Sequence, residues 1–173
     1  MPVPLLCVVV AAAQPPQIGW IFGLVVITVG AAIRLWGVAH LGSVGRTRAA
    51  TVGTLVQAGP YRYSRNPLYV GNLIIYIGVV VMVGRPVLSG VVVSAMWVHY
   101  RLIVHWEEWF LSSELGEPYQ EYCQNVSRWV GVGGVKYSPP THAWKIAIRS
   151  ERPTWLAIGT VVVALVCRGV VQM

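Results

Sequence analysis

The sequence predicts an all-α, polytopic membrane protein: one domain over residues 1–173 with four transmembrane helices, a short N-terminal fifth helix and a cytoplasmic amphipathic helix. Three observations predict this fold class. The chain is 55% hydrophobic and only 11% charged, whereas soluble proteins carry about 25% charged residues. Its mean hydropathy is +0.61. Its apolar residues gather in long runs separated by short polar segments. This composition excludes an ordinary soluble globule, a disordered chain and a disulfide scaffold.

The first part of the chain holds two apolar segments of different length. Residues 3–13 predict a short helix that turns at residues 14–16. A signal peptide is the disfavoured alternative, because no Lys or Arg precedes the apolar run. Residues 18–39 predict a full span, with Arg34 late enough in it to reach the interface. Gly19-x-x-x-Gly23 has the spacing that lets two membrane helices approach closely.

Residues 67–106 predict a helical hairpin. The stretch is predominantly apolar and is interrupted at Gly84-Arg85-Pro86. Forty helical residues would measure about 60 Å, twice the hydrocarbon thickness of a bilayer. The sequence therefore predicts two antiparallel helices, 67–83 and 87–106, joined by a tight turn. Their other two ends should share one face of the membrane, where Arg65-Asn66-Pro67 would approach Glu107 and Glu108.

Charge indicates which face this is. Residues 40–66 contain Arg and no acid, which is typical of a cytoplasmic loop. All six Glu lie within residues 107–153, the polar segment after the hairpin. Inside it, residues 118–130 predict an amphipathic helix at the membrane surface, with Tyr119, Tyr122, Val126, Trp129 and Val130 on its apolar face. Residues 154–171 predict a last span. Basic residues placed as topology signals give no reason to expect a nucleic-acid partner.

The facing ends of the hairpin are the predicted site. Asn66 suits the N-cap and Pro67 the first position of a helix, whose free N–H groups attract anions. Arg65 adds a bidentate donor. Glu107 or Glu108 would bind hydroxyl or amino groups of a polar cofactor, or accept a proton. His105 and Glu108 have the i, i+3 spacing of di-iron bundles, but no second such motif occurs, so no metal site is predicted.

Four motifs in order resemble one family: Gly53-Thr-Leu-Val56, Gly59-Pro-Tyr-Arg-Tyr-Ser-Arg-Asn-Pro-Leu-Tyr-Val-Gly71, Glu107-Glu-Trp-Phe-Leu111 and Gly116-Glu-Pro-Tyr-Gln-Glu-Tyr122. Over about residues 18–130 the chain resembles the isoprenylcysteine carboxyl methyltransferase and phospholipid methyltransferase superfamily. The resemblance implies an integral membrane enzyme that uses S-adenosylmethionine, bound on the cytoplasmic face by a core at about 45–130. It also implies a lipid or prenylated small-molecule substrate.

The resemblance assigns roles to particular residues. It implies that the cofactor is bound by Thr54, Leu55, Val56, Tyr61, Asn66, Pro67, Leu68, Tyr69 and Glu107. A carboxylate acceptor would need a cation, either Arg65 or Arg101. An amine acceptor would need to lose a proton, with Glu108 or His105 as the receiving group. The acceptor, and hence O- or N-methylation, stays open at this point.

The chain departs from the family pattern at several positions. Asn66 stands where many members have His and cannot take a proton, and Gly53 also replaces a common His. Arg101 is the nearest arginine before the Glu pair, six residues from Glu107. The chain also continues into an extra span at 154–171. Two alternatives remain: a membrane NADPH-dependent enzyme resembling sterol reductases, which share an Arg-x-Pro-x-Tyr-x-Gly motif, and a non-enzymatic membrane interaction or transport protein.

Overall fold

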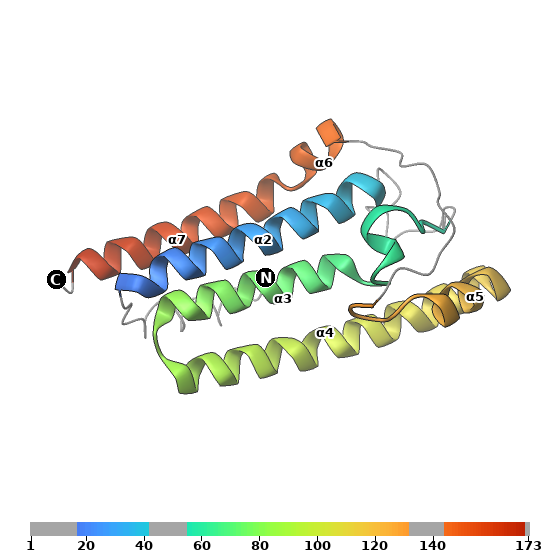
Figure 1. Cartoon of the computed structure of the whole chain (residues 1–173), viewed down its shortest axis with the longest axis horizontal. Helices are drawn as coiled ribbons and strands as arrows, with labels where there is room; N and C mark the ends of the chain where they lie inside the picture. Colours follow the sequence, from blue (N-terminus) through green and yellow to red (C-terminus); the bar gives the residue numbers. More distant parts are fainter. Residues whose placement is uncertain (1–16, 42–54, 132–143, 172–173) are drawn as a thin grey trace.

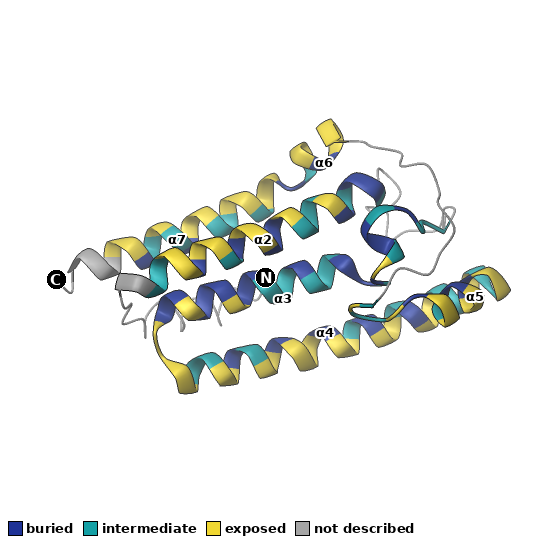
Figure 2. Ribbon diagram, in the orientation of Figure 1, coloured by how far each residue is buried: buried dark blue, intermediate teal, exposed yellow. Residues whose placement is uncertain are grey.

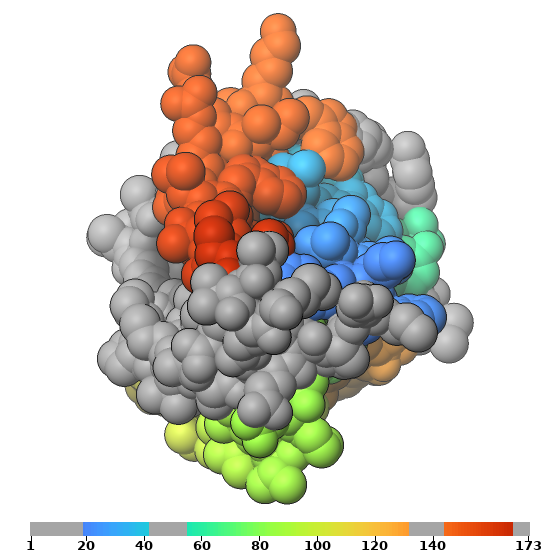
Figure 3. Space-filling model, turned by 90° about the vertical axis from the view of Figure 1, so that its left-hand side faces the viewer, coloured from blue at the N-terminus to red at the C-terminus, as the bar shows by residue number. Residues whose placement is uncertain are grey.

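The computed structural model describes residues 17–41, 55–131 and 144–171, and these residues are helical without any strand. The elements are α2 (Gln17–Leu41), the 3-10 turn η2 (Gly59–Arg62), α3 (Pro67–Val83), α4 (Pro86–Leu115), α5 (Glu117–Asn125), α6 (Trp144–Ser150) and α7 (Arg152–Val171). The predicted helix at 3–13, together with Gly53 and Thr54, lies outside the described residues. The long helices run roughly along one axis, and α3 contacts both α2 and α4 (Figure 1). In the end-on view, α6 is at the top, α7 and α2 lie below it, and the α3–α4 turn is at the bottom (Figure 3).

The predicted hairpin is present, but its second helix is longer than expected. Gly84 ends α3 with φ of 70°, a left-handed conformation that costs glycine little, and Pro86 opens α4. α4 has 30 residues, or about 45 Å, against about 30 Å of hydrocarbon. Glu107 and Glu108 therefore lie inside α4, not after it as predicted. The helix continues because Leu111 and Leu115 extend its inner face and pack against α5.

Glycines bring the backbones of α2 and α3 into direct contact. Gly23, Gly30 and Gly37 recur every seven residues along α2. A Cβ on Gly30 would lie 2.7 Å from the carbonyl oxygen of Gly71, and one on Gly78 would lie 2.7 Å from that of Gly23. The sequence had suggested Gly19-x-x-x-Gly23 as a contact face. Gly23 does lie in the interface, but the contact repeats at seven residues rather than four.

Within the described part of the chain, two helices are long and apolar enough to cross a membrane, Gly19–Leu41 and Pro86–Leu115, and a third span results if α6 and α7, bent by 48°, are counted together. This is fewer than the four spans predicted, because α3 is apolar but has only 17 residues. α3 is also largely buried, whereas α4 exposes most of its surface (Figure 2). Trp106 and Trp109 are exposed and lie about 30 Å along α4 from its start, a distance close to the hydrocarbon thickness of a bilayer. Tryptophans are enriched at the membrane–water interface, so this position is typical of an interfacial aromatic belt.

The amphipathic helix predicted at 118–130 is shorter in the structure. α5 ends at Asn125, and Val130, predicted on the apolar face, is exposed. The helix stops because the following segment pairs with the chain before α3: the Arg65 N–H donates to the Ser127 carbonyl at 2.9 Å. Tyr119 and Tyr122 are buried as predicted. Their side of α5 packs against Leu55, Leu111 and Leu115, so it covers the end of α4.

Candidate functional site

Three segments meet at the end of the hairpin where α3 begins. The chain leading into α3 is tied to the segment after α5 by two backbone hydrogen bonds, from Arg65 to Ser127 and from Gly131 to Tyr63, each 2.9 Å. A third tie comes from α5, where the Tyr122 hydroxyl donates to the Tyr61 carbonyl at 2.7 Å. These bonds fix residues 61–65 against α5 and the segment that follows it.

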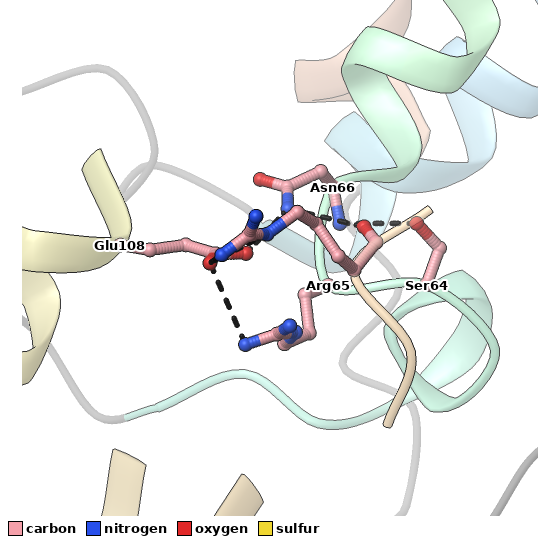
Figure 4. A network of polar contacts seen from close by, with 5 residues as sticks. Ser64, Arg65, Asn66 and Glu108 are labelled. Atoms are coloured by element: carbon pink, nitrogen blue, oxygen red, sulfur yellow. Dashed lines mark hydrogen bonds and ion pairs between the residues drawn. The ribbon is translucent and has the colours of Figure 1, made fainter. Parts of the chain in front are cut away.

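Glu108 is the buried centre of this junction (Figure 4). Its side chain is 9% exposed, and Oε2 accepts from Arg128 at 2.8 Å and lies 3.5 Å from Nη1 of Arg65. Oε1 accepts a hydrogen bond from the Asn66 amide at 3.0 Å. Both carboxylate oxygens are therefore engaged, and protonating Glu108 would leave two guanidinium groups without their anion. This geometry suits Glu108 to holding segments together, and it disfavours the predicted role of proton acceptor.

Asn66 occupies the predicted N-cap position of α3, but its side chain does not cap the helix. The amide nitrogen instead donates to Glu108 at 3.0 Å and to the Arg128 carbonyl at 3.1 Å. An asparagine amide has two N–H donors, so both are used. A side-chain amide at position 66 thus links the start of α3 to α4 and to the segment after α5.

Glu107 faces a different side of α4 from Glu108. Adjacent residues on an α-helix are rotated by about 100°, so the two carboxylates point in different directions. Glu107 is half-buried and accepts a 2.7 Å hydrogen bond from the Tyr69 hydroxyl. Tyr69 in turn lies against Tyr100, with ring centroids 5.2 Å apart. The two predicted carboxylates therefore have different partners, Tyr69 for Glu107 and Asn66 with Arg128 for Glu108.

A pocket of about 510 Å³ opens between α4 and α5 on the Glu108 side. This volume falls within the range of about 300–1,000 Å³ typical of small-molecule sites. Its lining residues come from both helices and the segment after α5: His105, Glu108, Trp109, Ser112, Tyr119, Gln120, Cys123, Gln124 and Arg128. Of the predicted proton acceptors, His105 is the one exposed at this pocket.

Tyr61 lies at the base of the junction in η2. It is 7% exposed, and burial raises the pKa of its hydroxyl, with Tyr122 adding to the effect. The phenol therefore stays protonated at physiological pH. Nearby, the Nε atoms of Arg62 and Arg65 are buried and have no hydrogen-bond partner within the described part of the chain.

The remaining predicted residues divide into those near the junction and those away from it. Leu55 packs beside the α5 tyrosines, Val56 is half-buried and Pro67 is fully buried. The Leu68 side chain points at Gly37 of α2 rather than toward Glu107. Arg101 is exposed, and among the described ion pairs none joins it to either carboxylate.

Arg128 is the site residue that the sequence did not reveal. The amphipathic pattern placed it on the polar face of a helix, so it read as a solvated charge. In the structure it follows the end of α5 and donates through Nε and Nη2 to Glu108. The sequence signal for Arg128 is a single arginine that follows an acidic segment. This signal is weak, because any helix at a protein surface can carry such an arginine.

The family model for phospholipid methyltransferases matches residues 18–117. The chain belongs to the phospholipid methyltransferase family. The matched range contains α2, α3, α4 and the chain between α2 and α3, so Tyr61, Asn66, Tyr69 and both carboxylates lie in the family core.

Named relatives agree with this assignment. The chain is 33% identical over 113 residues to protein-S-isoprenylcysteine O-methyltransferase A of Arabidopsis thaliana, covering 61% of this chain and 56% of the relative. It is 31% identical over 116 residues to protein-S-isoprenylcysteine O-methyltransferase of Mus musculus, covering 64% of this chain and 41% of the relative. The chain thus spans about half the length of the curated relatives it matches. No solved structure matches it.

A second polar centre joins the core of this phospholipid methyltransferase family member to the helices beyond it. Arg34 of α2 donates to Glu151 through Nε at 2.6 Å and through Nη2 at 3.2 Å. Its Nη1 donates to Asn72 of α3 at 2.9 Å. Glu151 is 5% exposed and sits at the break between α6 and α7, outside the matched range.

Proposed function

We propose that the protein is an integral membrane methyltransferase that uses S-adenosylmethionine and methylates the carboxylate of an isoprenylcysteine-type acceptor. The observation that carries the proposal is the junction itself. There a half-buried carboxylate of α4, Glu107, accepts a hydrogen bond from the Tyr69 hydroxyl of α3 at 2.7 Å. Family membership and the activities named for the relatives support the same reaction class.

The junction fits the charges of S-adenosylmethionine. That molecule carries a sulfonium and an amino group, a carboxylate, and ribose hydroxyls. Glu107 can accept from hydroxyl or amino groups, and the unpartnered Nε donors of Arg62 and Arg65 suit the carboxylate. The faces of Tyr61 and Tyr69 can stabilise a nearby cation. We assign the remaining predicted contacts among the described residues, at Leu55, Val56, Asn66 and Pro67, to the walls of this site.

When bound, S-adenosylmethionine supplies a methyl group on its sulfonium, which a carboxylate oxygen takes to give a neutral methyl ester and S-adenosylhomocysteine. The residues at the junction can therefore act by positioning alone, because no proton moves in this reaction. This agrees with Asn66, which cannot accept a proton, and with Glu108, whose oxygens are engaged by Arg128 and Asn66. An amine acceptor would instead require a proton acceptor, and His105 at the α4–α5 pocket is the exposed candidate.

The membrane arrangement follows from the same proposal. α2, α3, α4 and the bent α6–α7 pair would each cross or enter the bilayer, with the junction on the cytoplasmic face. The arginines before α3 support that orientation because basic residues collect on the cytoplasmic side. The acceptor would reach the junction laterally from the lipid, and the cofactor would reach it from water.

The test measures cofactor binding and methyl transfer with the full chain in nanodiscs. Radiolabelled S-adenosylmethionine is offered with N-acetyl-S-farnesylcysteine and, separately, with phosphatidylethanolamine. We expect label in the farnesyl compound, and we expect Glu107→Gln to weaken cofactor binding about tenfold or more, as loss of a charged hydrogen-bond partner does. Glu114→Gln is the matched control, since Glu114 lies exposed on the same helix.

Three results discriminate between the possibilities. Label in phosphatidylethanolamine alone would change the acceptor to an amine. Wild-type protein that does not bind S-adenosylmethionine would refute the proposal, and the membrane-reductase alternative would then be tested by NADPH binding. Equal cofactor affinity for Glu107→Gln and Glu114→Gln would remove Glu107 from the site.

A further inference from the structure

The contact between Arg34 and Glu151 has the geometry of carboxylate recognition. The Nε and Nη2 atoms of Arg34 face the two oxygens of one carboxylate, at 2.6 and 3.2 Å. This side-on, bidentate arrangement is the one by which arginine selects planar carboxylates. The side chains are 21% and 6% exposed, so the pair is largely removed from solvent. The structure thus shows a guanidinium already fitted to a carboxylate.

This guanidinium lies close to the junction. Asn72, which accepts a hydrogen bond from Arg34, is three residues after Tyr69 on α3. Three helical residues correspond to about 4.5 Å of rise, so Asn72 is about one turn further along α3 than the tyrosine that holds Glu107. The charge of Arg34 also acts on the hydroxyl of Tyr61. An anion bound by Arg34 would therefore lie next to the proposed cofactor site, on its membrane side.

The two partners have different positions in the family. Arg34 lies within the range matched by the family model, and Glu151 lies outside it. Arg34 lies in a helix long and apolar enough to cross a membrane, and ionisable residues in such helices are costly and usually functional. Glu151 therefore reaches Arg34 from a segment outside the family core, which suggests that Arg34 can also serve another partner.

Glu151 also sits on a joint in the chain. α6 and α7 are bent by 48° at this residue. Pro153 follows two residues later and lacks the N–H that would continue the helix. Hydrogen bonds still bridge the bend, from the Glu151 N–H to Ala147 at 3.0 Å and from the Trp155 N–H to Glu151 at 2.9 Å. The backbone of Glu151 is therefore held by hydrogen bonds at the bend between α6 and α7.

We propose that Arg34 is the receptor for the carboxylate of the lipid acceptor, and that Glu151 is an internal carboxylate that occupies Arg34 until the acceptor displaces it. The inference rests on the proposed function for the identity of the acceptor. The helices beyond the family core then act as a built-in competitor: binding of an acid requires Glu151 to leave Arg34. The apparent affinity for the acid is reduced by the fraction of molecules in which Arg34 is occupied.

Equilibrium binding to the full chain in nanodiscs tests this, with N-acetyl-S-farnesylcysteine as the acid and its methyl ester as the uncharged comparison. Glu151→Gln should bind the acid at least about tenfold more tightly than wild type, because the internal competitor loses its charge. Binding of the ester should not change. Arg34→Gln should lose the preference for acid over ester. Glu114→Gln, which removes an exposed carboxylate elsewhere, should behave as wild type.

A double variant keeps the test decisive if Glu151→Gln leaves Arg34 unpaired and unfolds the protein. Arg34→Gln/Glu151→Gln has no uncompensated charge, and it should bind acid and ester equally. Acid affinity of folded Glu151→Gln at or below that of wild type would overturn the proposal. A double variant that still prefers the acid would also overturn it.

The readouts separate this inference from the proposed function. Neither acid nor ester binding requires methyl transfer, and cofactor affinity is measured independently on the same samples. If wild type does not bind S-adenosylmethionine, the proposed function fails. If it does bind, and acid affinity does not respond to Glu151, only the present inference fails.

Discussion

At the scale of single residues, Glu108 illustrates how a carboxylate can be needed without reacting. Its two oxygens join α4 to Asn66 before α3 and to Arg128 after α5. Each of those segments is short, and after α5 Val126 and Trp129 also pack against the apolar clusters. A charged group with three partners therefore adds to the packing that holds these segments in place.

Glu108→Gln should lower the free energy of unfolding by about 2–3 kcal/mol, because a buried carboxylate with charged partners is replaced by a neutral amide. Half-exposed Arg128 retains some hydration, which limits the loss. Thermal unfolding in detergent measures the effect. Glu121→Gln on the exposed side of α5 provides the comparison. Equal melting temperatures for both variants would show that the junction does not depend on Glu108.

Sequence reasoning predicted which residues meet at the junction better than it predicted how they are oriented. The hairpin argument brought Arg65 and Asn66 toward Glu107 and Glu108, and the structure places all four there. It could not predict that the two carboxylates face different sides of α4, because that requires knowing that the helix continues past them. A one-residue difference along a helix is a rotation of about 100°, and the expected helix end at 106 left that rotation undefined.

At the scale of elements, α2 and α3 pack through their glycines. Apolar side chains gain little from each other in lipid, so close backbone contact becomes the main source of association. Residues separated by seven lie on one face of a helix. Gly23 and Gly30 of α2 accordingly meet Gly78 and Gly71 of α3.

Gly30→Ala should destabilise the fold by about 1–3 kcal/mol, the usual cost of overpacking. The new Cβ would meet the Gly71 carbonyl at 2.7 Å, so the helices must separate. Gly90→Ala in α4 is the matched control, because nothing lies within 4 Å of a Cβ there. That change should stabilise by about 0.5–1 kcal/mol through helix propensity. If both variants melt alike, the helices do not rely on this contact.

The tyrosines around α5 predict sensitivity to alkali. Burial raises the pKa of Tyr61, Tyr119 and Tyr122. An unfolded tyrosine ionises near pH 10, so the stability linked to these groups is full below about pH 10 and is lost as the pH rises above it. The melting temperature should fall between pH 9 and 11, and less so in Tyr122→Phe. Tyr63→Phe, at an exposed tyrosine, should keep the wild-type profile. An unchanged profile in Tyr122→Phe would contradict the assignment.

The element boundaries show where periodicity stops being informative. Gly84 and Pro86 fixed the turn of the hairpin, and α3 has the predicted bounds. The end of α4 was placed at 106 because the apolar residues thin out there. The helix nevertheless continues, since α5 covers Leu111 and Leu115. Tertiary cover of this kind has no signature in the local sequence.

At the scale of the whole molecule, the α3–α4 turn and the junction at the start of α3 lie at opposite ends of the hairpin. Exposed Val87 lies near the start of α4, and exposed Ser113 lies near its other end. In a cysteine-free background, Ser113→Cys should react with a membrane-impermeant maleimide applied to the cytoplasmic side of inverted vesicles. Val87→Cys should react only from the opposite side. Labelling of both positions from one side would refute the proposed topology.

The length of α4 makes the protein responsive to the thickness of its membrane. About two thirds of the helix is enough to cross the hydrocarbon, and Glu107 and Glu108 stand just beyond that point, beside Trp106 and Trp109. In a bilayer a few ångströms thicker, these carboxylates would be drawn toward acyl chains unless the helix tilted less. Hydrophobic mismatch would then act on the junction. The length of the lipid acyl chains would affect the same residues that hold the junction together.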